Sequence, residues 1–124
     1  MDKYYITSSY IEFNNFFRIP RSLFLAPEFE SMSNDAKLLY TVLLDRASLS
    51  AANCWVDRHG RVYIYFSLFV IQRTLGCGKA KALRLLRELE DAGLIERKKQ
   101  GQGKPSIIYV KLIDEGPGLV YTPA

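Results

Sequence analysis

The stretch SLFVIQRTLGCGKAKALRLLRELEDAG, residues 67–93, decides the fold. Ser67 is a favourable N-cap residue and Gly76 a favourable helix end, so the segment between them is predicted to form a short helix. A second helix is predicted to begin close behind it, at Lys79, and to stop at Gly93. Two short helices joined by a tight turn that contains glycine form a helix-turn-helix motif.

The second helix of this motif separates its apolar side chains from its cations. At 100° per residue one face is apolar, formed by Ala82, Leu85, Leu86, Leu89, Ala92 and Gly93. Arg84 and Arg87 lie on the opposite side. Lys79 and Lys81 flank that side in the first turn. Cations at a helix N-terminus oppose the helix dipole, so we infer that an external polyanion favours them there.

Recognition helices contact DNA base edges mainly through their N-terminal residues. We therefore expect Lys79, Lys81 and Arg84 to read bases in the major groove, and Arg87 to contact a phosphate.

The segment ERKKQGQGKPS, residues 96–106, follows the helix pair and precedes the apolar run IIYV. LIERKK and SIIYVKLI are predicted to be two strands joined by QGQGKP, which makes the motif a winged helix. Glycines let such a loop turn tightly and approach a sugar–phosphate chain. The wing residues expected to contact DNA are Arg97, Lys98, Lys99, Gln100 and Lys104.

The distribution of charge supports a polyanion-binding surface. Residues 67–113 contain ten Lys/Arg against four Asp/Glu, a net charge of +6. Residues 1–66 sum to zero, and residues 114–124 carry −2. All of the excess positive charge therefore lies in the block that holds the helix pair and the wing.

The rest of the chain supports one α+β domain over residues 1–113. Ser33 is predicted to cap an amphipathic helix of about 15 residues, and CWVDRHGRVYIYF is predicted to form an extra β-hairpin. Residues 1–32 suggest a short strand at Tyr10–Phe13, then a turn and a short helix near the prolines. The fold expected is a winged helix-turn-helix with three main helices, and residues 114–124 are expected to be a linker.

Several classes of function lack their residues. The longest nearly apolar run, YIYFSLFVI, is too short to span a membrane, and no secretory signal is visible, so a cytoplasmic protein is expected. Two cysteines, Cys54 and Cys77, and a single histidine make a zinc site improbable and fit reduced thiols. No phosphate-binding loop or nucleophile motif occurs, so neither a cofactor nor an enzyme activity is expected.

Several residues that could suggest a function, four of them in or beside the hairpin, have simpler structural interpretations. His59 in DRHG is expected to be a turn residue, and Cys77 a small packing residue. Trp55 and the tyrosines of RVYIYF are expected in the sheet core rather than as a platform for stacking bases.

The chain resembles the N-terminal domain of the plasmid replication initiator protein A (RepA_N) family. The resemblance covers roughly residues 10–113, and its most specific part is the helix SNDAKLLY…DR followed by NCWVDRHGRVYIYFS. It implies a winged-helix domain that binds double-stranded DNA at origin repeats, generally as a homodimer. Members usually continue into a C-terminal domain that recruits host replication proteins. The sequence departs from the family pattern in two places. Gly78 stands where the family usually has Ser or Thr, and the first turn of the second helix is unusually rich in lysine.

Our hypothesis from the sequence is therefore a non-enzymatic, sequence-specific DNA binder that acts in plasmid or mobile-element replication initiation. A transcriptional repressor that binds an operator palindrome would need the same surface and stays open, as does a protein-interaction winged helix that binds no nucleic acid. The N-terminal aromatic residues favour a dimer, although they would also fit packing within one domain; they are Tyr4, Tyr5, Tyr10, Phe13, Phe16 and Phe17.

Overall fold

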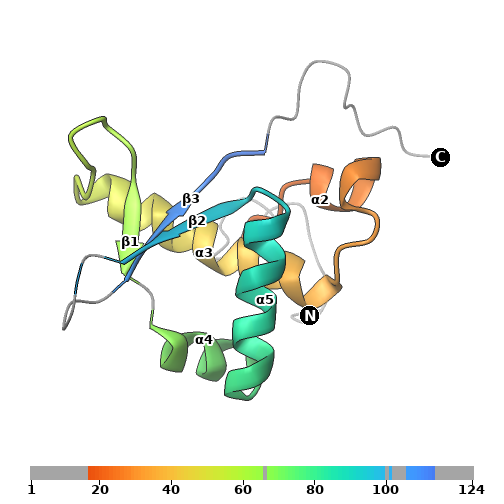
Figure 1. Ribbon diagram of the computed structural model, residues 1–124. Helices are drawn as coiled ribbons and strands as arrows, with labels where there is room; N and C mark the ends of the chain where they lie inside the picture. Colours follow the sequence, from red (N-terminus) through yellow and green to blue (C-terminus); the bar gives the residue numbers. More distant parts are fainter. Residues whose placement is uncertain (1–16, 66, 100, 102–105, 114–124) are drawn as a thin grey trace, which may run out of the picture.

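The computed structural model of the chain describes residues 17–65, 67–99, 101 and 106–113. The elements, in chain order, are α2 (Ser22–Leu25), the 3-10 helix η1 (Pro27–Phe29), α3 (Asn34–Ala52), β1 (Tyr63–Tyr65), α4 (Leu68–Leu75), α5 (Lys79–Asp91), β2 (Ile95–Lys98) and β3 (Ile107–Val110) (Figure 1). The strand expected at Tyr10–Phe13, the wing residues Gln100 and Lys104, and the expected linker lie outside the described residues.

The helix-turn-helix forms as the sequence predicts. The hydroxyl of Ser67 accepts a hydrogen bond from the Val70 N–H at 3.2 Å and caps α4. Gly76 ends this helix with a φ of 65°, in the left-handed region that glycine adopts most easily. Gly93, with a φ of 76°, follows α5. Both helix ends are therefore set by local signals.

Helix α3 begins at the predicted cap but is longer than expected. The Ser33 hydroxyl accepts a hydrogen bond from the Ala36 N–H at 3.2 Å, and the helix runs for 19 residues to Ala52. Cys54, with a φ of 63°, takes the left-handed position just beyond its end. A cysteine there carries no sequence signal comparable to a glycine, so the end of α3 could not be predicted from the pattern.

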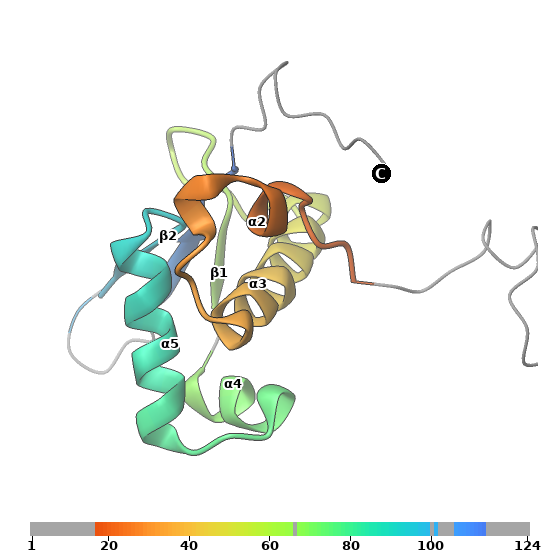
Figure 2. The same cartoon turned by 90° about the vertical axis from the view of Figure 1, so that its right-hand side faces the viewer.

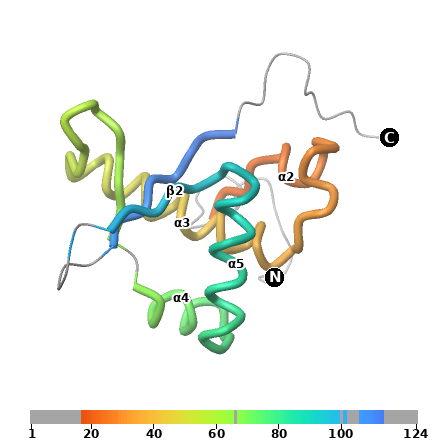
Figure 3. The backbone as a smooth tube through the Cα atoms, in the orientation of Figure 1, coloured from red at the N-terminus to blue at the C-terminus, as the bar shows by residue number. Residues whose placement is uncertain are grey.

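The sheet has the strand order β1-β3-β2, with both pairings antiparallel. Ile108 in the central strand pairs with Ile64 and Arg97. Side chains alternate along a strand, so Ile64, Ile95 and Ile108 face the helices, and each is 2% exposed. The chain leaves α5 through β2 and returns through β3, as Figure 3 traces. This strand pair is the predicted wing.

Helices α3, α4 and α5 enclose one core with the sheet. The fully buried side chains from the helices include Leu39, Tyr40, Leu43, Ile71 and Leu89. The hydroxyl of Tyr40 donates a hydrogen bond to the Lys111 carbonyl at 2.7 Å, which satisfies it and fixes the chain beyond β3. Figure 2 shows α4 at one end of the domain and α2 at the other, with α5 running from beside α4 up to β2. Within the described ranges, no helix combines the length and the apolar character that crossing a membrane requires.

The predicted hairpin before β1 is less regular than its sequence suggests. Its first arm is reduced to an isolated bridge between Val56 and Val62, on the edge of β1 that does not pair with β3. We expected Trp55 and the tyrosines here in the sheet core. That expectation is wrong for Trp55 and Tyr65, which are 45% and 42% exposed. Tyr65 alternates with Ile64 along β1, so Ile64 is the buried residue of this strand, and the Trp55 ring packs edge-on against Tyr65.

Candidate nucleic-acid interface

Helix α5 has an outward side that carries cations. Ala82, Leu85, Leu86 and Leu89 are buried against the core, so the residues at the opposite helical angles face solvent. Arg84 and Arg87 lie there and are exposed, and so is Lys79 in the first turn. Within the described part of the chain, none of these three cations takes part in an ion pair. They remain available to an external anion.

One flank of α5 is attached to the start of α3. Nζ of Lys81 lies 2.6 Å from Oδ2 of Asp35, with both side chains about half exposed. Two turns later, the carboxylate of Glu88 accepts hydrogen bonds from the Ser33 N–H at 2.6 Å and the Ser33 hydroxyl at 2.8 Å. Lys81 therefore contacts α3, beside the outward cations rather than among them.

The opposite flank of α5 is attached to the wing. Arg97 in β2 donates through Nε to Glu90 Oε1 at 2.8 Å, and a second guanidinium nitrogen donates to the same oxygen. Both side chains are 32% exposed, so this pair is better shielded from water than a surface ion pair. The pair joins the root of the wing to the last turn of α5.

The remaining described wing cations point into solvent. Lys98, at the end of β2, and Lys99, which follows it, are both exposed. Nine residues were expected to contact DNA. Five of them are exposed: Lys79, Arg84, Arg87, Lys98 and Lys99. Lys81 and Arg97 instead form ion pairs within the domain, and Gln100 and Lys104 lie outside the described residues. Glu88, Glu90 and Asp35 were not expected at this site. Their partners lie on other elements, so spacing along a single helix could not indicate them.

Comparisons with known proteins agree with this geometry. A protein-family model described as "Replication initiator protein A (RepA) N-terminus" matches residues 15–121. The chain belongs to the RepA_N family. A "41 kDa protein" of Lactobacillus helveticus is 34% identical over 86 residues, which make up 69% of this chain but 24% of that protein. The chain therefore spans about a quarter of this curated relative.

Solved structures share the RepA_N fold over nearly the whole chain. One, described as "N-Terminal domain of DNA binding protein", is 33% identical with a TM-score of 0.73 and covers 90% of this chain and 86% of its own. A second, "Structure of Rep-DNA complex", is 33% identical with a TM-score of 0.72, covering 87% and 83%. A third, "Structure of MDR initiator", is 27% identical with a TM-score of 0.72, covering 91% and 89%.

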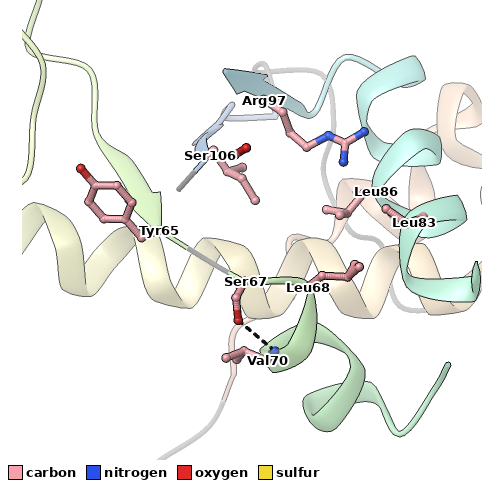
Figure 4. A pocket seen from close by; sticks show the side chains of 9 residues that line it. Tyr65, Ser67, Leu68, Val70, Leu83, Leu86, Arg97 and Ser106 are labelled. Carbon is pink, nitrogen blue, oxygen red and sulfur yellow. Dashed lines mark hydrogen bonds between the residues drawn. The ribbon is translucent and has the colours of Figure 1, made fainter. Parts of the chain in front are cut away.

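This RepA_N domain also has a hollow between α5 and the wing, with a volume of about 520 Å³. The residues that line it are Tyr65, Ser67, Leu68, Val70, Leu83, Leu86, Arg97, Ser106 and Ile108. Figure 4 shows Leu83 and Leu86 on α5, Ser67 beside Leu68 at the start of α4, and Tyr65 and Ser106 near the sheet. The hollow thus combines leucine side chains of α4 and α5 with hydroxyl groups at the start of α4 and near the sheet.

The turn of the irregular hairpin in this RepA_N domain depends on Asp57. Its carboxylate accepts hydrogen bonds from the N–H groups of His59 and Arg61, from Nε of Arg61, and from the Tyr109 hydroxyl, at 2.8 to 3.0 Å. Burial works to raise the pKa of Asp57, but these hydrogen bonds outweigh it and hold the pKa well below its ordinary value. His59 is a turn residue here, as expected from the sequence.

The described residues contain no group of three His, Cys, Asp or Glu side chains placed to hold a metal ion. Both cysteines are free thiols. Cys54 is exposed, and Cys77 is partly buried against the core, which agrees with its predicted packing role.

Proposed function

We propose that this domain binds double-stranded DNA sequence-specifically at repeats in the origin of a plasmid or mobile element, and so initiates replication. The observation that supports it best is the outward side of α5, where Lys79, Arg84 and Arg87 are exposed and form no ion pair with any other described residue. Lys98 and Lys99 of the wing extend the positive surface. A major groove about 12 Å wide admits a helix of this size.

Each cation has a proposed role that follows from its position. Lys79 and Arg84 read base edges, because they lie in the first two turns of α5. Arg87, Lys98 and Lys99 contact phosphates, which position the protein without reading sequence. Lys81 was expected to read bases. Its ion pair with Asp35 instead favours a positioning role, and the Glu90 pair favours the same for Arg97.

Relatives support DNA as the partner. One similar structure is described as a Rep-DNA complex and another as the N-terminal domain of a DNA-binding protein. We propose that the domain acts by binding and catalyses no reaction, and that host replication proteins are recruited by a part of the protein outside this chain.

We also propose that the domain forms a homodimer through the apolar surface of α2 and the residues just before it. Of the N-terminal aromatic residues that favour a dimer, Phe17 alone lies within the described residues, and it is 57% exposed. Ile19, Phe24 and Leu25 line one shallow hollow and are 41%, 55% and 43% exposed. Exposed apolar side chains gathered in this way are typical of an interaction surface. Sedimentation of the chain at micromolar concentrations should give a dimer, and Phe24→Asp should shift it toward monomer. The matched control is Leu49→Asp, at an equally exposed leucine of α3.

Selection of bound duplexes from a random pool tests the proposed function. Tandem copies of one short sequence are expected, because an origin offers repeated sites. A lone palindrome would favour a transcriptional repressor instead, and no enrichment over unselected duplex would contradict DNA recognition by this domain.

A further inference from the structure

One ridge of α5 places an exposed leucine between two cations. Lys79, Leu83 and Arg87 follow each other at intervals of four residues, so their side chains are neighbours on the helix surface. Leu83 is 42% exposed, and both cations are exposed. A ligand that both cations contact at once would lie close to Leu83.

Leu83 also lies at the edge of the hollow between α5 and the wing (Figure 4). Two other residues that line the hollow, Leu86 and Ile108, are 4% and 2% exposed and belong to the hydrophobic core. Leu83 is far more exposed than either of them, although it lines the same hollow. A single exposed leucine is common on protein surfaces. This one stands out because it combines exposure, a cationic ridge and an apolar hollow.

Thymine offers the apolar group that such a leucine would contact. In the major groove, the C5 methyl group distinguishes thymine from the other bases, and aliphatic side chains contact it. With α5 in the groove, the strand that passes between α5 and the wing would place its base edges toward Leu83. Its sugar–phosphate chain would then face Ser67 and Ser106, whose hydroxyl groups can donate to phosphate oxygens.

We propose that Leu83 determines specificity by packing against the C5 methyl group of one thymine in the strand that crosses the hollow. This inference rests on the proposed function, because it needs α5 in the major groove. It adds an apolar readout to the guanine or phosphate contacts expected of Lys79, Arg84 and Arg87. One position of the bound sequence should therefore require thymine because of its methyl group.

Replacement of single thymines by deoxyuridine tests this inference, since it removes one methyl group and leaves every hydrogen-bonding group in place. The duplex is the sequence selected from the random pool, and each thymine is replaced in turn. At one position, binding should weaken about fourfold, the effect of one methyl group returned to water. Leu83→Ala should bind the parent duplex about as weakly and should be insensitive to the replacement.

Two further variants make the result specific. Leu83→Met keeps an apolar side chain and should keep the sensitivity to deoxyuridine at the same position. Leu49→Ala removes an exposed leucine from α3, outside the residues that line the hollow, and should bind both duplexes as the parent protein does. Circular dichroism would confirm that all three variants fold.

The possible outcomes separate this inference from the proposed function. If the domain selects no duplex, both the proposed function and the inference about Leu83 are wrong. If the domain binds its duplex but no thymine is sensitive, or if the sensitive thymine is equally sensitive in Leu83→Ala, DNA binding stands and the role of Leu83 is wrong.

Discussion

Nζ of Lys81 lies 2.6 Å from Oδ2 of Asp35, which joins the first turn of α5 to the first turn of α3. Glu88 makes a second connection to the same helix end through Ser33. On the other flank, Glu90 connects α5 to Arg97 of the wing. Helix α5 is thus attached on both flanks through its own charged residues, and its outward cations are left for a ligand.

Substitution of Lys81 separates a positioning role from direct DNA contact. Lys81→Ala should reduce the free energy of unfolding by less than about 1 kcal/mol, because the ion pair is half exposed. It should weaken DNA binding while leaving the salt dependence of log K unchanged, since no phosphate contact is lost. Urea unfolding and binding at several salt concentrations measure both effects.

A double-mutant cycle of Lys81→Ala with Asp35→Ala is the control. The two effects on stability should be less than additive, because each substitution removes the same ion pair. A salt slope that falls by about one in Lys81→Ala would instead show that Lys81 contacts a phosphate, and a relaxed preference at one base pair would show that it reads a base, as expected from the sequence.

Arg84 and Lys99 should respond differently to truncation. Arg84→Ala should cost about 1–3 kcal/mol of binding free energy and relax the preference at one base pair, because a base-reading arginine supplies discrimination there. Lys99→Ala should weaken all sequences alike and lower the salt slope of log K by about one. Binding to selected and scrambled duplexes over a salt series distinguishes the two. A uniform loss in Arg84→Ala would contradict base reading.

Much of this fold could be predicted because its deciding signals are local. Ser67 caps the start of α4 and Gly76 ends it, and the spacing of the leucines in α5 determines which face of that helix is buried. Each of these signals lies within a few residues of sequence. Positive charge gathered in one block pointed to the surface that α5 and the wing share.

Longer-range relationships could not be predicted in the same way. Asp35 and Lys81 are far apart in sequence and meet only because α3 and α5 pack together. The position of Lys81 in its own helix therefore predicted a cation available to DNA, whereas the structure has an ion pair there. Trp55 was expected in the core because its segment has strand character. In the structure Trp55 lies outside the three strands, packs edge-on against Tyr65 and is 45% exposed, and strand character alone does not indicate which side chains a core covers.

The two glycines that flank Cys77 should behave differently on substitution. Gly76→Ala should destabilise the domain by about 1 kcal/mol, because alanine disfavours its φ of 65°. Gly78 has an ordinary φ of −81° and caps α5 without a side-chain hydrogen bond, and a Cβ atom there would meet no atom within 4 Å. Gly78→Ser should therefore stabilise the domain by a few tenths of a kcal/mol through a new cap. Urea denaturation measures both, and equal effects of the same sign would contradict the assigned roles.

Asp57 should make the stability of the domain sensitive to acid. Burial opposes ionisation, but four hydrogen bonds to the carboxylate prevail, so its pKa in the folded state is lower than in the unfolded chain. The unfolded state therefore binds the proton more tightly. The stabilising contribution is complete above the unfolded pKa near 4 and is lost as pH falls toward the folded pKa.

Asp57→Asn should accordingly lower the melting temperature at pH 7 and show a smaller further loss between pH 5 and pH 2 than the parent protein does. Tyr109→Phe removes one of the four donors and should have a weaker effect in the same direction. Asp45→Asn, at an exposed position of α3, controls for the loss of one negative charge without the loss of this turn. Thermal unfolding across that pH range provides the measurement. An equally steep acid loss in Asp57→Asn would mean that other carboxylates, and not this turn, govern the acid sensitivity of the fold.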